Sequence, residues 1–189
     1  MDKTAPLTGM RIAILTEDAF EQVEMTEPRK ALDAAGATTV LISQHTPHVQ
    51  GWNHHDKGDS FPVDLALDQA KPEDFDALHL PGGGLNADKL RTEPQAVAFV
   101  RAMADAGKPI SAICHAPWIL IEAGIAKGRT LTSWPSLQTD LRNAGATWVD
   151  ETVAEDQSLV TSRKPDDIPA FNQRIIKLFS TARQTAGAR

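Results

Sequence analysis

The amino-acid sequence predicts an α/β fold of three layers, in which a doubly wound, mostly parallel sheet lies between helices. Residues 10–16, 77–80 and 110–113 are short apolar runs without polar alternation, as expected of parallel strands buried on both faces. Segments with helical periodicity separate these runs along the chain. Strands and helices that alternate in this order build a mostly parallel sheet.

The first half of the chain carries a strand–helix–strand unit and one polar interruption. After the first strand we expect a helix with Pro28 in its first turn and an end near Gly36. Residues 38–43 are rich in β-branched side chains and form the next expected strand. Residues 45–70 are polar and contain turn-forming glycine and proline, which predicts a hairpin outside the main sheet.

The second half continues the alternation around strand 110–113. Residues 93–106 have the apolar spacing of an amphipathic helix that packs on a sheet. After residue 113 we expect a helix to about residue 123, a short strand near Thr130, a helix over 136–143, a hairpin of 148–154 with 159–162, and a closing helix over 165–181. Ligands of such sheets bind beyond the carboxyl ends of the strands, which directs attention to the residues that follow strands 77–80 and 110–113.

Length and composition limit the possible classes of protein. The 189 residues fit one domain spanning 1–189, with flexible tails at about 1–9 and 181–189. A net charge of −6 argues against non-specific nucleic-acid binding, and no segment approaches the ~20 apolar residues of a membrane span. The single cysteine excludes an intramolecular disulfide, and a reducing cytoplasm is the default expectation, with an exported protein without disulfides as the alternative.

Cys114 lies where an apolar strand runs into a helix, which is the sequence pattern of a nucleophile elbow. Ala112 and Ala116, two residues before and after it, are small enough for the tight strand-to-helix turn. The turn places the thiol near a helix N-terminus, where unpaired N–H groups favour a thiolate. A buried structural thiol is the alternative, because free cysteine is among the most buried residue types.

A glycine run follows strand 77–80 and should meet Cys114 at the same edge of the sheet. Gly83 and Gly84 lack a Cβ, so their backbone N–H groups can approach a ligand closely. The elbow itself supplies the N–H of His115, the residue after the nucleophile. A plain turn after a strand is the alternative for the glycines.

His115 is the obvious proton acceptor for Cys114, although neighbours in sequence do not usually face each other. All six histidines lie at or before residue 115, so no triad with a later histidine can form. Several carboxylates follow the first strand, and we expect Glu24 to hydrogen-bond the thiol. We also count Glu21 among the candidate substrate-binding residues. Ordinary charge complementation at a helix N-terminus is the alternative for these acidic residues.

The histidine-rich segment 45–56 raises the question of a metal site. Imidazole and carboxylate groups bind zinc, but the spacing of His45, His48, His54 and His55 matches no compact zinc motif. We therefore predict neither a metal nor a cofactor. His79, in the middle of a strand, is expected to be a core histidine with its hydrogen bonds satisfied.

Several motifs make the chain resemble the PfpI-type intracellular protease and deglycase family. The resemblance extends from about Arg11 to Phe179. Its most specific motifs are residues 20–24 (FEQVE), 80–83 (LPGG), 112–117 (AICHAP), 128–135 (GRTLTSWP) and 162–167 (SRKPDD). The family belongs to a superfamily with a flavodoxin-like, class I glutamine amidotransferase-like fold, and the general stress protein 18 branch is the most similar.

The resemblance implies a role for each of the main candidate residues. Cys114 is the nucleophile with His115 beside it, and Glu24 holds a hydrogen bond to the sulfur. The backbone N–H groups of Gly83 and His115 are the implied oxyanion donors. In protease-type members an acidic residue from a neighbouring subunit completes the triad, and Asp88 is its counterpart when one inserted residue is allowed.

One position departs from the family pattern. Trp134 stands where many relatives carry a tyrosine, and this chain contains no tyrosine. An indole N–H donates a hydrogen bond but cannot accept one or exchange a proton as a hydroxyl does. Chemistry that relies on that hydroxyl is therefore not expected here.

Three functions remain open at this point. We favour a stress-response cysteine hydrolase that acts on glyoxals or reactive-carbonyl adducts, with Cys114 attacking and His115 moving protons. A redox-sensing or protective thiol is one alternative, since no second cysteine can resolve an oxidised Cys114. A peptidase whose Asp88 crosses an oligomer interface is the other. The expected partners are a small-molecule or protein-adduct substrate and further copies of the chain, as a homodimer or higher oligomer, but neither nucleic acid nor a membrane.

Overall fold

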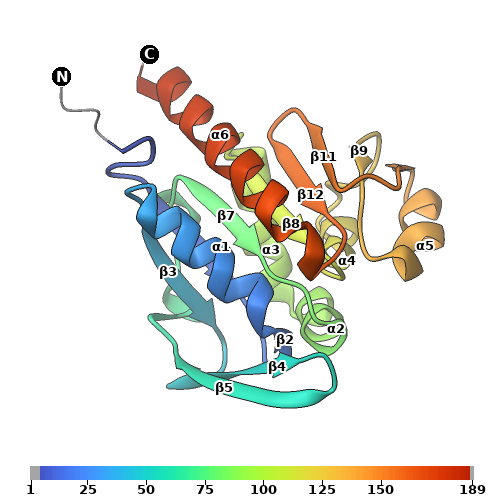
Figure 1. Cartoon of the computed structure of the whole chain (residues 1–189), viewed down its shortest axis with the longest axis horizontal. Helices are drawn as coiled ribbons and strands as arrows, with labels where there is room; N and C mark the ends of the chain where they lie inside the picture. Colours follow the sequence, from blue (N-terminus) through green and yellow to red (C-terminus); the bar gives the residue numbers. More distant parts are fainter. Residues whose placement is uncertain (1–4, 188–189) are drawn as a thin grey trace.

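A seven-stranded sheet runs through the centre of this computed structural model, which describes residues 5–187 (Figure 1). The strand order is β11-β12-β8-β7-β1-β3-β6, and every neighbouring pair is parallel except β11 with β12. The strands are β1 (Arg11–Leu15), β3 (Thr38–Ser43), β6 (Leu65–Ala66), β7 (Ala77–Leu80), β8 (Ile110–Ile113), β11 (Val153–Asp156) and β12 (Leu159–Ser162). The order confirms the predicted doubly wound, mostly parallel sheet.

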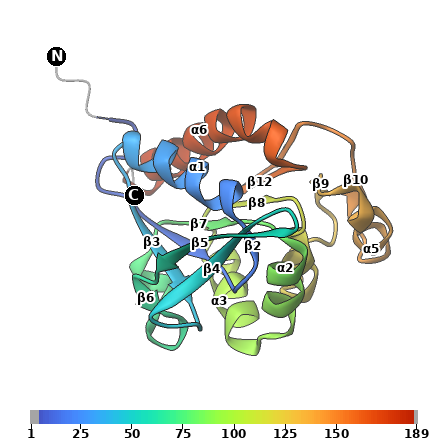
Figure 2. The same cartoon turned by 60° about the horizontal axis from the view of Figure 1, so that its bottom comes forward.

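Helices cover both faces of the sheet, which confirms the three predicted layers (Figure 2). One face carries α1 (Gln22–Ala34) and α6 (Ile168–Gly187), and the other carries α2 (Gly84–Thr92) and α3 (Pro94–Asp105). Helix α4 (Pro117–Glu122) packs against α2 and α3, and α5 (Gln138–Asn143) packs against β10. The core under α1 and α6 includes Ile12, Ile113 and Phe171, and the core under α3 includes Leu15, Leu80 and Phe99.

Two small sheets accompany the main one within the described residues. β2 (Phe20–Glu21) pairs with β4 (His48–Asn53), which forms the predicted hairpin with β5 (Asp56–Pro62). β9 (Thr130–Leu131) pairs with β10 (Thr147–Trp148). Short 3₁₀ helices are η1 (Leu67–Gln69), η2 (Pro72–Asp74), η3 (Pro135–Leu137) and η4 (Pro165–Asp167). Because β2 directly follows the β1 loop, its pairing brings the hairpin to the carboxyl edge of the main sheet.

The predicted place of Pro28 in the first turn of its helix is wrong. Helix α1 begins at Gln22, so Pro28 lies in its middle. Proline has no N–H to donate to the carbonyl four residues earlier, which here belongs to Glu24. That carbonyl instead lies 2.8 Å from Nε2 of His79, so the helix tolerates the proline.

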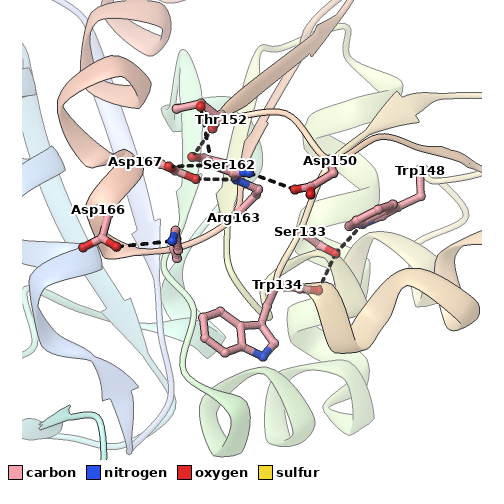
Figure 3. Close-up of polar contacts among 10 residues, drawn as sticks. Ser133, Trp134, Trp148, Asp150, Thr152, Ser162, Arg163, Asp166 and Asp167 are labelled. Atoms are coloured by element: carbon pink, nitrogen blue, oxygen red, sulfur yellow. Dashed lines mark hydrogen bonds and ion pairs between the residues drawn. The ribbon is translucent and has the colours of Figure 1, made fainter.

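The predicted strand over 148–154 is also wrong, since two short strands occupy this region. β10 pairs with β9, whereas β11 pairs with β12. The loop between them is held by Arg163, whose Nη1 donates to Asp150 Oδ1 at 2.8 Å and whose Nε donates to Asp167 Oδ2 at 2.8 Å (Figure 3). These charged contacts hold the chain between two sheets, and apolar periodicity does not encode them.

Both ends of the described chain are structured. Leu7 is fully buried. Helix α6 continues through residue 187, and the side chain of its Phe179 is fully buried. The predicted flexible tails, 1–9 and 181–189, therefore include residues with regular contacts, and the remainder of each tail lies outside the described residues. Among the helices described, none has the length and apolar character needed to cross a membrane.

Candidate active site

Cys114 occupies a strained turn between β8 and α4, as the elbow pattern predicts. Its φ is +63°, a left-handed conformation that is unfavourable for a residue with a Cβ. Neighbouring segments fix this backbone on both sides. The N–H of Cys114 donates to the carbonyl of Ser162 at 3.0 Å, and its carbonyl accepts from the N–H of Trp134 at 2.9 Å. The strain is therefore maintained by the sheet and by the loop after β9.

The sulfur of Cys114 is surrounded by hydrogen-bonding groups. His115 Nδ1 lies 3.1 Å from Sγ, and the Glu24 side chain and the backbone N–H groups of Gly83 and His115 lie close to the sulfur. Burial raises the pKa of the Cys114 thiol, an ionised Glu24 raises it further, and the two N–H donors lower it. The residue is only 6% exposed, so its protonation depends on these few neighbours.

Glu24 is a fully buried carboxyl group in the first turn of α1. Its Oε2 accepts from the N–H of Gly82 at 2.9 Å. Burial, with a smaller contribution from the charge of Glu21, raises the pKa of Glu24 to about 8. The carboxyl group is therefore protonated at neutral pH and can donate its hydrogen to the neighbouring sulfur.

The glycines after β7 are required because the chain passes through a space with no room for side chains. A Cβ on Gly82 would lie 2.3 Å from Glu24 Oε2 and 2.6 Å from the Cβ of Cys114. A Cβ on Gly83, whose φ is +93°, would lie 2.6 Å from the carbonyl oxygen of Ala19. Close backbone approach to the site is thus the specific reason for glycine here.

Asn86 fixes the position of the glycine loop after β7. Its Nδ2 donates to the carbonyls of Pro81 and Gly82 at 3.1 and 2.8 Å, and its Oδ1 accepts from the N–H of Glu17 at 2.6 Å. The side chain is fully buried. Asn86 therefore ties the loop after β7 to the loop after β1, which orients the N–H groups that face Glu24 and Cys114.

His115 is held by aromatic rings. Its ring makes an edge contact with Trp118 at 5.4 Å and stacks on Trp134 at 5.8 Å with an interplanar angle of 22°. Within residues 5–187, no side chain or carbonyl hydrogen-bonds its Nε2. Burial lowers the pKa of His115, so the ring is neutral at neutral pH and can take up a proton.

Trp134 is positioned through its backbone, which leaves its ring at the edge of the site. The indole N–H of Trp148 donates to Ser133 Oγ at 2.9 Å, and that hydroxyl donates to the carbonyl of Trp134 at 2.8 Å (Figure 3). The Trp134 ring is 38% exposed, which is unusual for so large an apolar side chain. It is thus available to contact a ligand.

These groups open into a pocket of about 710 Å³ at the carboxyl edge of the sheet. The structure brings seven of the eight predicted site residues to this pocket, namely Glu21, Glu24, Gly83, Gly84, Cys114, His115 and Trp134. Asp88 is the exception, since it lies exposed on α2 outside the pocket lining. Its proposed role across a subunit interface stays a prediction.

The histidines of segment 45–56 are distributed between different environments. His54 and His55 line the pocket from the tip of the β4–β5 hairpin, whereas Nε2 of His45 pairs with the buried carboxylate of Glu17 at 2.7 Å. Across the part of the chain that the structure describes, no three histidine, cysteine or acidic side chains are grouped to hold a metal ion. His79 is a core histidine with both ring nitrogens hydrogen-bonded, as predicted.

The structure adds site residues that the sequence did not identify. Asn86 lies in α2, a helix absent from the predicted elements, and Trp52 reaches the pocket from β4. The contact of Trp118 with His115 was also not predicted, although Trp118 lies only four residues after Cys114. The glycine run was a usable signal for the start of α2, because Gly83 is its N-cap and glycine is modestly enriched at that position.

Comparison with known proteins identifies relatives over most of the chain. A sequence profile of the DJ-1/PfpI family matches residues 10–178. An uncharacterized protein of Staphylococcus aureus strain MRSA252 is 43% identical over 169 residues, which cover 88% of this chain and 96% of that protein. An uncharacterized protein of Staphylococcus epidermidis is 40% identical over the same length with the same coverage.

Solved structures agree with these matches. A two-domain protein from Anabaena variabilis, containing DJ-1/ThiJ/PfpI-like and ferritin-like domains, is similar with a TM-score of 0.83 and 33% identity. The match covers 89% of this chain and 47% of that one. Drosophila melanogaster DJ-1beta is similar with a TM-score of 0.81 and 26% identity, over 95% of this chain and 96% of that one.

Replacing Gly83 tests the close approach of the loop to Cys114. Gly83→Ala should force the backbone away from Ala19 and remove one N–H donor from the sulfur, so the alkylation rate of Cys114 at pH 7 should fall about tenfold or more. Gly124→Ala is the matched control, because Gly124 has a φ of +73° but no atoms within 4 Å of the place that a Cβ would occupy. Equal alkylation rates in the two variants would contradict the assigned role of Gly83.

Replacing Glu24 tests its buried proton. The folded protein keeps this proton up to a pKa of about 8, whereas the unfolded chain releases it near 4.5, so the stabilisation is complete below pH 4.5 and is lost as pH rises towards 8. Glu24→Gln cannot ionise. The unfolding free energy of this variant should therefore rise relative to that of the wild type, by a few kcal/mol, as pH increases from 4.5 to 8. Urea denaturation between pH 4.5 and 8 measures the difference, with exposed Glu73→Gln as control. Parallel curves for Glu24→Gln and the wild type would exclude a buried, protonated Glu24.

Proposed function

The chain belongs to the DJ-1/PfpI family, and from that premise we propose that it is a stress-related, cysteine-dependent enzyme acting on glyoxals and the adducts that release them. One observation carries the proposal. The strained thiol of Cys114 faces a protonated carboxyl group, two backbone N–H donors and a neutral imidazole inside a pocket. This combination suits covalent attack on a small carbonyl compound.

The first requirement is that Cys114 reacts as a thiolate. Cys114 and Glu24 are close enough to titrate as a pair, and burial disfavours a negative charge on both at once. After one proton leaves, the remaining charge is better placed on sulfur. Sulfur then receives two backbone N–H bonds and the Glu24 O–H, whereas a Glu24 carboxylate would receive one N–H from Gly82 and the thiol S–H.

The thiolate of Cys114 can then attack the aldehyde carbon of an α-oxoaldehyde. The C–S bond forms as the carbonyl π bond breaks, and the new alkoxide takes the proton of Glu24 to give a hemithioacetal. The backbone N–H groups of Gly83 and His115, which lie close to the sulfur, can stabilise the charge that develops on the oxygen. Glu24 ends this step as a carboxylate, so no net charge is created.

His115 is placed to complete the reaction. Its neutral ring can remove the proton from the carbon bonded to sulfur, which leaves an enediolate. The hydroxyl proton on that carbon's oxygen passes to the neighbouring oxygen, and His115 returns its proton to the neighbouring carbon, which gives a 2-hydroxy thioester. Water then cleaves the thioester to a 2-hydroxy acid and restores the thiol. The net change is the addition of one water to the oxoaldehyde, with no external oxidant or reductant.

The pocket lining supports an uncharged or cationic substrate. Its ionisable side chains are Glu21, Glu24, Cys114 and histidines, and the described lining contains no lysine or arginine. The rings of Trp52 and Trp134 add apolar surface. An anionic substrate would meet the carboxylate of Glu21 without a permanent positive charge to offset it.

Oxidation of Cys114 is a second proposal for the same site. A protonated Glu24 can donate a hydrogen bond to a sulfinate oxygen, and the chain has no second cysteine to form a disulfide. Mild peroxide should then add two oxygen atoms to Cys114 and stop, as seen by intact mass. In Glu24→Gln the same product should form. Glu24→Leu removes the donor and should instead yield the sulfonic acid, and a wild-type mass without added oxygen would refute this proposal.

The enzymatic proposal is tested by following product. Wild-type protein should convert methylglyoxal into a 2-hydroxy acid with many turnovers, and both Cys114→Ala and Cys114→Ser should reduce the rate to background. Chromatographic detection of the acid is required, because free aldehyde also disappears through reaction with surface amines. His48→Ala, an exposed residue away from the pocket lining, is the matched control and should keep full activity. Undiminished acid formation by Cys114→Ala would rule out the proposed mechanism.

A further inference from the structure

His79 is a buried histidine that the proposed chemistry does not use. It lies in the middle of β7 with no exposed surface, and its ring packs 5.9 Å from the ring of Phe171 on α6. Burial lowers the pKa of His79 to about 4, so the ring is neutral at physiological pH. Keeping an imidazole in the core requires partners for both ring nitrogens.

The first partner of His79 is the backbone of Glu24. Nε2 lies 2.8 Å from the carbonyl oxygen of Glu24, and a carbonyl can only accept, so Nε2 carries the hydrogen. This carbonyl needs an outside donor because Pro28, four residues later in α1, has no N–H to give. The imidazole therefore replaces the missing helical hydrogen bond in the first turn of α1.

The second partner of His79 comes from the strand that carries Cys114. Nδ1 lies 3.0 Å from Oγ of Ser111 on β8, and with the hydrogen on Nε2 this nitrogen accepts from the hydroxyl. Ser111 stands three residues before Cys114 in the chain. A continuous hydrogen-bonded path thus runs from β8, through His79, to the residue that bears the catalytic carboxyl group.

Glu24 is consequently held at two points by a single segment. His79 binds its main-chain carbonyl, and the N–H of Gly82, just beyond the end of β7, binds its side-chain Oε2 at 2.9 Å. Two attachments fix the position and the direction of a side chain more tightly than either does alone. The carboxyl group is thereby held beside Cys114.

We propose that His79 is a positioning residue for the active site: it occupies the hydrogen-bonding position vacated by Pro28 and sets Glu24 against Cys114. The inference rests on the proposed function in that Glu24 is taken to donate to the sulfur. A histidine that only fills the core would affect stability without changing the ionisation of Cys114. The two roles are therefore separable by experiment.

The test uses the rate of Cys114 alkylation by iodoacetamide as a function of pH. His79→Leu removes both hydrogen bonds, and it should raise the apparent pKa of Cys114 by about one unit and slow alkylation at pH 7 about tenfold. Adding Pro28→Ala restores a backbone N–H for the Glu24 carbonyl. The double variant should therefore return towards the wild-type profile, although His79 is still absent.

Two single variants serve as controls. Pro28→Ala alone should keep the wild-type profile, because the carbonyl of Glu24 already has a donor. His79→Gln can still donate to that carbonyl and accept from Ser111, and it should show a smaller shift than His79→Leu. Circular dichroism establishes that each variant is folded. If His79→Leu alone does not fold, the double variant decides the question.

Three results would overturn the proposal. They are a folded His79→Leu variant with the wild-type profile, a folded double variant that keeps the full shift, and a double variant that fails to fold. Alkylation needs no substrate turnover. If Pro28→Ala reverses the effect of His79→Leu on alkylation while the wild type converts no methylglyoxal, the role of His79 is upheld and only the proposed function is rejected.

Discussion

The pairing of two buried ionisable groups, the carboxyl of Glu24 and the thiol of Cys114, is the constraint on which the site depends. Both groups lie in a space that disfavours negative charge, and an ionised Glu24 would raise the pKa of Cys114 further. Close packing leaves no room for a larger side chain, since even a methyl group on Gly82 would collide with both. The few fixed donors around the pair therefore decide which atom carries the charge.

The fold supplies those donors from segments that meet only at the carboxyl edge of the parallel sheet. β7 ends in the glycine loop, β8 ends in the strained Cys114, and the carbonyl of Ser162 at the end of β12 accepts the Cys114 N–H. Asn86 ties the glycine loop to the end of β1. The strain at Cys114 is stable because several independent segments enforce it together, which is the usual condition for such backbone geometry.

The part of this arrangement that the sequence could predict follows from local pattern. The apolar run 110–113 and the small residues around Cys114 placed the nucleophile at a strand end, and the carboxylates after the first strand indicated Glu24, in agreement with the resemblance. The remainder depends on contacts between distant segments, such as His79 with Glu24 across 55 positions. The sequence pattern predicted Pro28 in the first turn of its helix. It could not show that an imidazole replaces the hydrogen bond that a proline cannot donate within a helix. Likewise, nothing local indicates that Trp118 and Trp134 orient His115.

We infer that the charge of the pair resides on sulfur, and the ultraviolet absorbance of the thiolate tests this most directly. Cys114 is the only cysteine in the chain, so a pH titration with Cys114→Ser as the blank reports this group alone. We expect thiolate absorbance to appear with a midpoint below the ordinary cysteine pKa of about 8.5. Absorbance that appears only well above the ordinary cysteine pKa of about 8.5 would place the charge on Glu24 and contradict the account.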